Sequence, residues 1–506
     1  MLEPVLQAAW EGWLLVFSWP NILYPIAGTL LAMVFATIPG LTGAALMALA
    51  IPMTLHWDLL PTMLIFGAFV GGATFMGSVT AILFNIPGRA SSAATLLDGH
   101  PLAQQGQAST AIGCAAAASA LGSTFGVLVL VLLIPFMRAM LLAFGPAEFL
   151  MLALWGLTTL AVLSRESVLK GLAAAGLGLM LSFIGYDPRT AELRYTFGVS
   201  YLSDGMSLVP VFLGLFALSE VFALMRSGRT AVLAKPRSEM LGGSAWMGVL
   251  AVFSNFGLFL RSSAIGTIIG IIPGIGASVA GFVAYGHAAQ WARRDRERFG
   301  SGDIRGVLAP EAANDAKDGG ALVPTLAFGI PGGTATAVLL AALFAHGLGA
   351  GSEMLSSQLT LVFVLIWSLF LSNWLTSLLG LAAVRPMTHL AMLKTNVVIP
   401  IILMLATIGA YFSRGQMADV IAAYLFAVLG YAMRKNGWPR VPMVIALVLG
   451  PLFEQNLHLT LRLQALERID FWQRPIPMVL LALCVVSLTL PAFQRLRAGR
   501  STEARQ

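Results

Sequence analysis

The sequence predicts an all-α polytopic membrane protein with about 11 to 13 transmembrane helices and two inverted repeats that contain Pro-Gly-broken or re-entrant helices. Of its 506 residues, 58% are hydrophobic and 10% are charged, too few charges to cover a soluble globule. Apolar runs of about 17 to 25 residues, the length that crosses about 30 Å of hydrocarbon, recur from end to end. Two of the apolar stretches also carry paired Pro-Gly breaks.

The apolar runs give the predicted spans in chain order. Two of them, 43–57 and 441–452, are short enough to be half-helices. The predicted spans are 22–38, 43–57, 61–83, 108–136, 148–164, 168–186, 204–226, 246–271, 276–292, 354–384, 395–412, 417–433, 441–452 and 476–494.

The two Pro-Gly-containing stretches read as copies of each other. Pro39 to Pro87 is 48 residues and Pro273 to Pro331 is 58, and residues 84–93 match 328–337 at five of ten positions. Chance alignment is the alternative, because Pro and Gly are common in transmembrane helices. Duplicated breaks are typical of the midplane site of a secondary transporter, since unpaired backbone groups in lipid must be satisfied internally.

The breaks also suggest how the chain is divided. Seven candidate crossings separate Pro39 from Pro273, and if all are complete the two breaks face opposite sides, as inverted repeats require. We expect the first repeat in 1–226, a cytoplasmic loop in 227–245 and the second-repeat motifs in 246–350, including a polar loop at 293–318. Residues 351–506 are plainer apolar helices, which suggests scaffold or partner surface.

Basic residues gather in short loops, and this bias predicts the orientation in the membrane. The loops around 226–237 and 434–440 and the tail at 495–505 are expected on the cytoplasmic side, so the C-terminus is expected there too. The net charge of +7 is therefore explained by topology, and we expect no nucleic-acid partner.

Each stretch continues past its second Pro-Gly pair as a helix start rich in hydroxyls. Helix N-termini offer unpaired N–H groups and a favourable dipole, so two of them meeting at the centre would bind a carboxylate. The alternative is that these hydroxyls bond within their own helices. The residues expected to bind substrate are Pro39, Gly40, Asn85, Pro87, Gly88, Arg89, Ser91, Ser92, Pro273, Gly274, Gly276, Pro331, Gly332, Thr334 and Thr336.

Arg89 is the basic residue closest to either helix start. Its guanidinium could pair bidentately with a substrate carboxylate. The alternative is that it reaches the membrane interface or pairs with Asp98.

The polar run 309–320 leads directly into an apolar segment. Glu311, Asn314 and Asp315 fall on roughly one face if the run is helical. Their oxygens could coordinate Na⁺ or carry a proton, with Asn85 as a competing ligand. The alternative is a solvated helix in a loop.

Several enzyme classes lack their motifs here. The sequence contains neither a GxxxxGK[ST] phosphate loop nor a GxSxG nucleophile elbow, and its six His residues show no ligand spacing. Cys114 and Cys484 lie in apolar segments, which does not suggest a metal or disulfide framework. We therefore expect no enzyme activity, no cofactor, and no metal other than a transported Na⁺.

Five stretches together resemble the large membrane subunit of the tripartite tricarboxylate transporter family. They cover nearly the whole chain. The stretches are 77–88 (Gly-Ser-Val-Thr-Ala-Ile-Leu-Phe-Asn-Ile-Pro-Gly), 94–101, 194–198 with 214–216 and Glu220, Pro273-Gly274-Ile275-Gly276 through 310–314, and 449–452.

The resemblance implies a bacterial inner-membrane symporter subunit driven by a Na⁺ or H⁺ gradient. It further implies a small four-helix membrane subunit and a periplasmic binding protein that delivers a di- or tricarboxylate or a related organic acid. Three positions depart from the family pattern. Asp315 stands where a second Asn is common, His100 where Tyr is common, and Arg89 where a small or polar residue is usual.

Two functions of other classes remain as alternatives. An intramembrane enzyme could use Glu311 and Asp315 on a lipid-linked substrate, but the missing nucleophile and metal motifs disfavour it. A receptor could dock a binding protein without transport, although a receptor needs no duplicated helix breaks.

Overall fold

The computed structural model describes residues 2–38, 41–85, 89–141, 143–162, 167–187, 190–227, 242–273, 277–292, 297–351, 353–382 and 395–503. Within these ranges the chain is helical apart from one two-stranded hairpin, β1 (Gly185–Tyr186) paired with β2 (Leu193–Arg194). The predicted all-α polytopic class is therefore confirmed.

The first part of the chain forms eleven α-helices within the described residues. A π-helical segment, Leu213–Leu218, joins the last two, and short 3₁₀ turns occupy Ala90–Ala93 and Ser200–Leu202. The helices are α1 (Leu2–Phe17), α2 (Leu23–Thr37), α3 (Gly43–Thr54), α4 (Leu59–Gly72), α5 (Thr74–Phe84), α6 (Leu96–Gln104), α7 (Ala108–Leu141), α8 (Pro146–Val162), α9 (Val168–Ser182), α10 (Leu208–Phe212) and α11 (Ser219–Ser227).

The second part of the chain forms ten α-helices within the described residues. A 3₁₀ turn, Phe471–Gln473, precedes the final helix. The helices are α12 (Ala245–Ser254), α13 (Phe256–Ile271), α14 (Ala277–Trp291), α15 (Arg305–Phe328), α16 (Thr334–Ala345), α17 (Leu359–Ala382), α19 (Thr395–Arg414), α20 (Met417–Lys435), α21 (Arg440–Ala465) and α22 (Pro475–Glu503).

Length and hydropathy identify the candidate membrane-crossing helices. Among the described residues, seven helices are long and apolar enough to cross, and α12 with α13, bent by 82°, makes eight if the pair is one span. Six shorter apolar helices accompany them. A total of 11 to 13 crossings is thus reached only if short helices also cross, and the total stays a prediction.

Three sequence boundaries need correction. The segment 441–452 is not a half-helix, because α21 continues to Ala465. The span 246–271 is not continuous, because it bends at Asn255 between α12 and α13. The polar loop placed at 293–318 ends before Arg305, where α15 begins, and the low hydropathy of this helix had concealed it.

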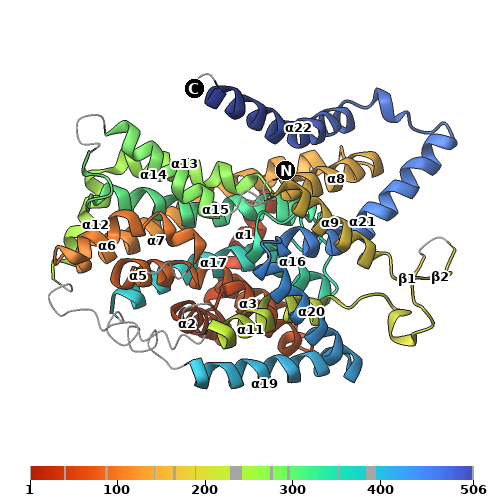
Figure 1. The fold of residues 1–506 in the computed structure, drawn as a ribbon, viewed down its shortest axis with the longest axis horizontal. Helices are drawn as coiled ribbons and strands as arrows, with labels where there is room; N and C mark the ends of the chain where they lie inside the picture. The colour runs from red at the N-terminus through yellow and green to blue at the C-terminus, as the bar shows by residue number, and fades with distance from the viewer. Residues whose placement is uncertain are drawn as a thin grey trace.

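Helix α15 lies between two helices that present glycines to it (Figure 1). On α7 these are Gly122 and Gly126, where an added Cβ would stand 2.5 and 2.3 Å from carbonyl oxygens of α15. On α13 they are Gly266 and Gly270, with corresponding distances of 2.1 and 2.4 Å. Both pairs form Gly-x-x-x-Gly stripes, the pattern that lets transmembrane backbones approach closely.

A second close packing joins α4 to α17 and uses hydroxyls as well as glycine. Ser372 and Thr376 of α17 donate to the carbonyls of Ala68 and Gly72 at 2.8 and 3.3 Å, and Ser368 donates to Leu64 one turn earlier. Because lipid offers no competing partners, such bonds fix the register of the two helices.

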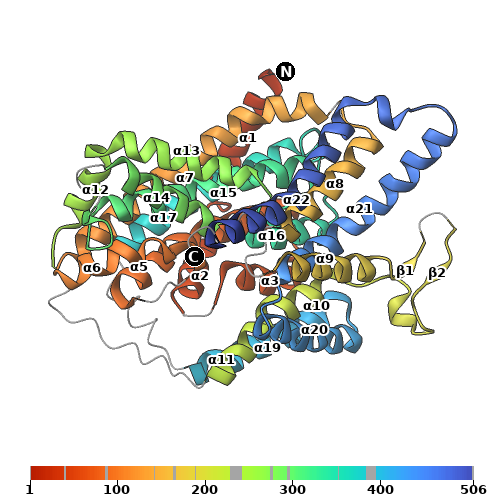
Figure 2. The same ribbon diagram turned by 45° about the horizontal axis from the view of Figure 1, so that its top comes forward.

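A long helix from each part of the chain packs against the other part. Helix α7, from the first part, packs on α15 of the second, while α17, from the second part, packs on α4 of the first. We call α1–α7 with α12–α17 the inner group. Helix α17, the first helix after residue 350, lies inside this group (Figure 2), and a scaffold role for residues 351–506 stays a prediction.

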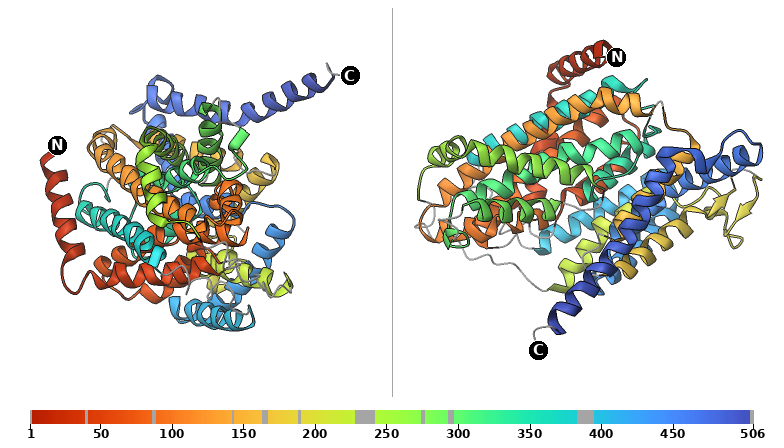
Figure 3. Two further views of the ribbon diagram at one scale, coloured as in Figure 1. Left: turned by 90° about the vertical axis from the view of Figure 1, so that its left-hand side faces the viewer. Right: turned by 90° about the horizontal axis from the view of Figure 1, so that it is seen from above.

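The remaining helices, α8–α11 with α19–α22, form what we call the outer group. Helix α21 packs on α8 and α9, while α20 packs on α10, α11 and the π-helical segment, and α22 covers α8 (Figure 3). Helices α3 and α16, which also contact each other, carry the main contacts between the two groups. Each follows a Pro-Gly pair in the chain.

The glycine packing yields a stability prediction. Gly266→Ala should destabilise the protein by about 1–3 kcal/mol, because overpacked atoms force backbone shifts. Gly257→Ala on the same helix places its Cβ where no described atom lies within 4 Å, so it should be neutral or slightly stabilising. Thermal unfolding of the purified chain measures both, and equal melting temperatures for the two variants would contradict the packing argument.

Candidate functional site

Each of the two copies has a first Pro-Gly motif, at Pro39 in one and at Pro273 in the other. The helices that precede these two motifs end in the same way. Ile38 caps the C-terminus of α2, with φ and ψ of −81° and 117°. Ile272 caps the C-terminus of α13, with φ and ψ of −82° and 113°. Both isoleucines donate a backbone bond to the carbonyl three residues earlier. Each then precedes a proline, which favours this extended backbone over a further helical turn.

The helices that precede the second Pro-Gly motif of each copy, at Pro87 and at Pro331, also end alike. Helices α5 and α15 end at Asn85 and Gly329, with φ of 55° and 67°, so both residues adopt the left-handed conformation. Gly and Asn are the residues that accept this conformation most readily at a helix end. The pairing of motifs read from sequence is thus matched by paired backbone geometry.

Helix α15 brings the predicted cation residues into the protein interior. Every residue from Gly306 to Ala327 is buried, including Glu311, Asn314 and Asp315. The solvated-helix alternative is therefore wrong. A polar helix can occupy this position only because α7, α13 and α14 surround it.

Glu311 is held by hydroxyls from three helical segments. Ser78 and Thr95 donate to one carboxylate oxygen, Ser78 at 2.7 Å, and Ser119 donates to the other at 3.2 Å. Ser78 also bonds Ser92 at 3.2 Å. Of the hydroxyls after Pro87-Gly88, Thr95 thus bonds Glu311 directly and Ser92 reaches it through Ser78.

Asp315 and Asn314 have no such partners. Their exposed fractions are 0% and 1%, and their side-chain oxygens and the Asn314 amide nitrogen form no hydrogen bond of normal geometry with described residues; the Ser119 hydroxyl lies near Asp315 but donates to Glu311. Helices α7 and α15 run in parallel register, so Ser123, also buried and unpartnered, follows Ser119 as Asp315 follows Glu311. An ionised carboxylate in such a place is costly unless a cation or proton joins it.

A buried ion pair follows on the same helix. The Lys317 ammonium contacts the Asp318 carboxylate, which also accepts from Thr74 at 3.4 Å. Arg89 donates to the Thr74 hydroxyl at 3.2 Å, so it lies near this pair. Lys317, Asp318 and Thr74 were not among the predicted site residues, although Lys317 and Asp318 belong to the same polar run.

The suggested pairing of Arg89 with Asp98 is wrong. Asp98 is fully buried and accepts bonds from the Tyr285 hydroxyl and from three backbone N–H groups in the segment before α15, at 2.8 to 2.9 Å. Its role is to fasten α6 to the start of α15. A Cβ at Gly306 would lie 2.0 Å from its carboxylate, so this approach requires glycine.

We call Pro87-Gly88 the first break and Pro331-Gly332 the second break. The second break is packed against α13 and α15. A Cβ on Gly332 would lie 2.7 Å from Ala321, and Pro331 is buried beside it. The Thr336 hydroxyl bonds the N–H and carbonyl of Gly333, so it caps its own helix as the alternative proposed. Thr334 is half-buried, and Pro273 is buried.

The remaining predicted site residues lie away from the acids of α15, have no described partner, or fall outside the described part of the chain. Asn85 is exposed at the end of α5, seven residues or about 10 Å along the helix from Ser78. Ser91 is buried and has no described hydrogen-bond partner. Pro39, Gly40, Pro87, Gly88, Gly274 and Gly276 lie outside the described residues.

These features define a polytopic α-helical membrane protein whose interior holds charged groups beside paired helix breaks. Residues 22–445 match the model of the tripartite tricarboxylate transporter TctA family. The chain belongs to this family, which makes it a component of a tripartite tricarboxylate transporter and places it among transport proteins.

Two relatives come from Agrobacterium vitis. An uncharacterized 52.8 kDa protein in the TAR-I ttuC' 3' region is 30% identical over 480 residues, which cover 94% of this chain and 95% of that protein. An uncharacterized protein in the TAR-II ttuC' 3' region is 30% identical over 235 residues, 46% of this chain and 97% of that protein.

The two buried acids should respond oppositely to neutralisation. Asp315→Asn removes an unpartnered charge, so it should raise the melting temperature in buffer free of Na⁺. Glu311→Gln breaks a satisfied set of bonds and should lower stability by about 1–3 kcal/mol. Thermal unfolding in choline buffer at neutral pH measures both, and destabilisation by both variants would show that Asp315 has an internal partner.

Proposed function

We propose that the chain is the permease subunit of an ion-driven symporter that imports a di- or tricarboxylate or related organic acid. The observation that carries this proposal is the buried Asp315 with its neighbour Asn314 on α15, the helix whose end matches that of α5. A buried acid without a partner binds a proton or metal cation far better than an exposed one, and such groups in membranes are typical of ion pathways.

The local charges support coupling to one cation. The stretch of α15 around Asp315 and the adjoining Arg89 hold the acids Glu311, Asp315 and Asp318 and the bases Arg89 and Lys317, and Asp98 lies apart from them at the start of the helix. With all five ionised, the set carries three negative and two positive charges, so one negative charge remains. One bound Na⁺ or H⁺ at Asp315 neutralises the set, and Asn314 supplies a further oxygen for Na⁺. Glu311, already satisfied by hydroxyls, positions α15.

Substrate carboxylates would bind beside Arg89, the basic residue next to the first break. Arg89 is half-buried and bonded only to a neutral hydroxyl among the interactions described, so its charge is available to an anion. Ser91 and Ser92 lie close behind it at the first break, and Thr334 with the start of α16 contributes at the second. The motif residues outside the described part of the chain remain proposed ligands on sequence grounds; they are Pro39, Gly40, Pro87, Gly88, Gly274 and Gly276.

Transport would move the inner group against the outer group, with α3 and α16 as the contact between them. This replaces the division at residue 350 by one in which 351–382 travels with the site. The periplasmic binding protein would deliver substrate on one face. The opposite, cytoplasmic face carries the basic cluster of Arg434 and Arg440, both paired with Glu220, and the C-terminus.

The proposed bilayer is the bacterial inner membrane, with a small four-helix subunit as the membrane partner. An intramembrane enzyme built on Glu311 and Asp315 would show turnover without a gradient. A receptor would bind its partner without uptake. Matched helix breaks around a buried charge set support transport over both.

Coupled uptake tests the proposal directly. We expect labelled citrate or another labelled di- or tricarboxylate to accumulate in proteoliposomes that contain the chain, its small partner and a binding protein, under a Na⁺ or a proton gradient imposed separately. Asp315→Asn should reduce accumulation about tenfold or more, while exchange of labelled for unlabelled substrate persists, because coupling and not binding is lost.

The matched control for this experiment is Thr460→Val, which alters another buried and unpartnered side chain in the outer group. Its uptake should equal that of the unsubstituted protein. Full gradient-driven accumulation by Asp315→Asn would exclude Asp315 as the coupling residue.

A disulfide tests the movement. A Cβ at Gly409 of α19 would lie 3.5 Å from the Cβ of Pro52 on α3, within the range for a disulfide. Gly409→Cys with Pro52→Cys, once oxidised, should stop uptake by joining the two groups, and reduction should restore it. Continued uptake with the bond formed would show that this boundary does not move.

A further inference from the structure

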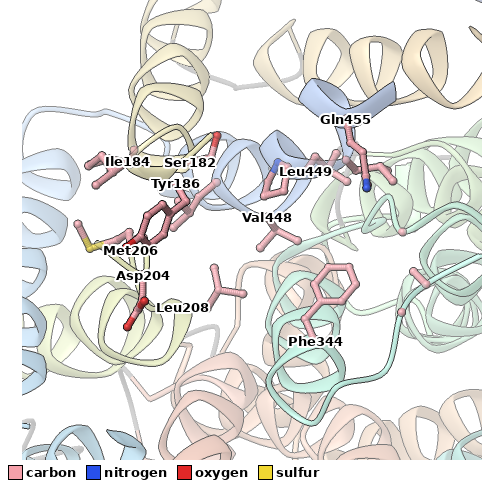
Figure 4. Close-up of a pocket in the computed structure, with 18 of the residues that line it drawn as sticks. Ser182, Ile184, Tyr186, Asp204, Met206, Leu208, Phe344, Val448, Leu449 and Gln455 are labelled. Atoms are coloured by element: carbon pink, nitrogen blue, oxygen red, sulfur yellow. The ribbon is translucent and has the colours of Figure 1, made fainter. Parts of the chain in front are cut away.

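A cavity of about 700 Å³ lies where the inner and outer groups meet (Figure 4). The inner group contributes Phe328, Gly329 and Phe344, from the end of α15 and from α16. The outer group contributes the end of α9, the start of α10 and the middle of α21, including Val448. Its volume is typical of small-molecule sites.

The cavity reaches the second break. Phe328 and Gly329 end α15, and Ile330-Pro331-Gly332 follows directly before α16. A molecule in the cavity would therefore lie beside the break that is proposed to bind substrate.

The lining is mainly apolar. Aliphatic and aromatic side chains from every wall face the space, and the polar side chains are those of Ser182, Tyr186, Ser203, Asp204 and Gln455. The described lining contains no Lys, Arg or His. A carboxylate would find no cation here and would meet Asp204, whereas an apolar body would gain about 25 cal/mol for each Å² it buries.

The segment that covers the cavity is held in place by ion pairs and a hydrogen bond. Arg194 pairs with Asp187 at 3.2 Å and with Glu454 of α21 at 2.6 Å. Tyr201 donates to Asp419 of α20 at 2.7 Å. The connection between α9 and α10 is therefore fastened to α20 and α21 of the outer group, which fixes the cavity wall that carries Tyr186 and Asp204.

We propose that this cavity is a vestibule that binds the apolar body of an organic acid while its carboxylate points to the second break. The proposal rests on the proposed transport function and adds a selectivity: among acids with equal charge, the one with the larger apolar body is preferred. Succinate and phenylsuccinate form a matched pair, since they share two carboxylates and differ by one ring.

Protection of an introduced thiol tests occupancy without any gradient. Ser203→Cys, nearly isosteric, puts a thiol on the cavity wall, and Ser200→Cys, exposed on the same segment and not part of the lining, is the control. In the full-length chain in nanodiscs, phenylsuccinate should slow maleimide labelling of Ser203→Cys about tenfold, succinate should not, and labelling of Ser200→Cys should not change.

Equal labelling of Ser203→Cys with and without either acid would overturn the proposal. Slow labelling in nanodiscs that becomes fast in detergent, whatever acid is present, would also overturn it and would identify lipid as the occupant.

A filling substitution gives a second test. Val448→Trp should raise the KM for phenylsuccinate uptake about tenfold and leave that for succinate unchanged, because only the ring needs the space. Leu459→Trp, half-exposed on the same helix and outside the lining, should change neither. If the unsubstituted protein takes up no acid, the transport proposal fails. If it does and Val448→Trp behaves normally, only the vestibule fails.

Discussion

The burial of α15 is the constraint on which the rest of the structure depends. This helix carries Glu311, Asp315, Lys317 and Asp318, yet every residue from Gly306 to Ala327 is buried. In hydrocarbon such a helix would be expelled, because each charge costs several kcal/mol of desolvation. The protein meets the constraint by surrounding the helix at backbone distance. Glycines on α7 and α13 remove the side chains that would hold neighbours apart, and hydroxyls satisfy one of the acids. Asp98 fastens the start of the helix from outside.

The exchange of long helices follows from the same requirement. A helix pair made only of sequence neighbours leaves one side of each member facing lipid, whereas α7 reaches across to α15 and α17 reaches across to α4. Helices α15 and α4 are each packed by a helix from the other part of the chain. The contacts differ in chemistry: α7 offers glycines, and α17 offers Ser368, Ser372 and Thr376 to the carbonyls of α4. Both allow close approach, so the inner group is joined as one body rather than as two adjacent repeats.

The sequence predicted the helix breaks well because Pro-Gly pairs act locally, and Ile38 and Ile272 indeed share their backbone geometry. It predicted the acidic residues of α15 as a site for the same reason, since their spacing is helical. It did not predict their burial, because hydropathy measures what a helix would lose in lipid and not what its neighbours supply. The contact of Thr74 with Asp318, 244 residues apart, lay equally beyond reach, as did the cavity. Such features arise from tertiary packing, which no local pattern encodes.

The tight packing around α15 also limits how the proposed site can open. Helices α7, α13 and α15 meet through backbone contacts, so a cation at Asp315 cannot leave by separating them without breaking this close packing. The proposed movement instead gives access along α3 and α16, which join the inner group to the outer one. The apolar cavity lies at this boundary and beside Gly329. If substrate enters there while the cation binds behind it, one movement of the inner group carries both, and coupling requires no separate gate for the ion.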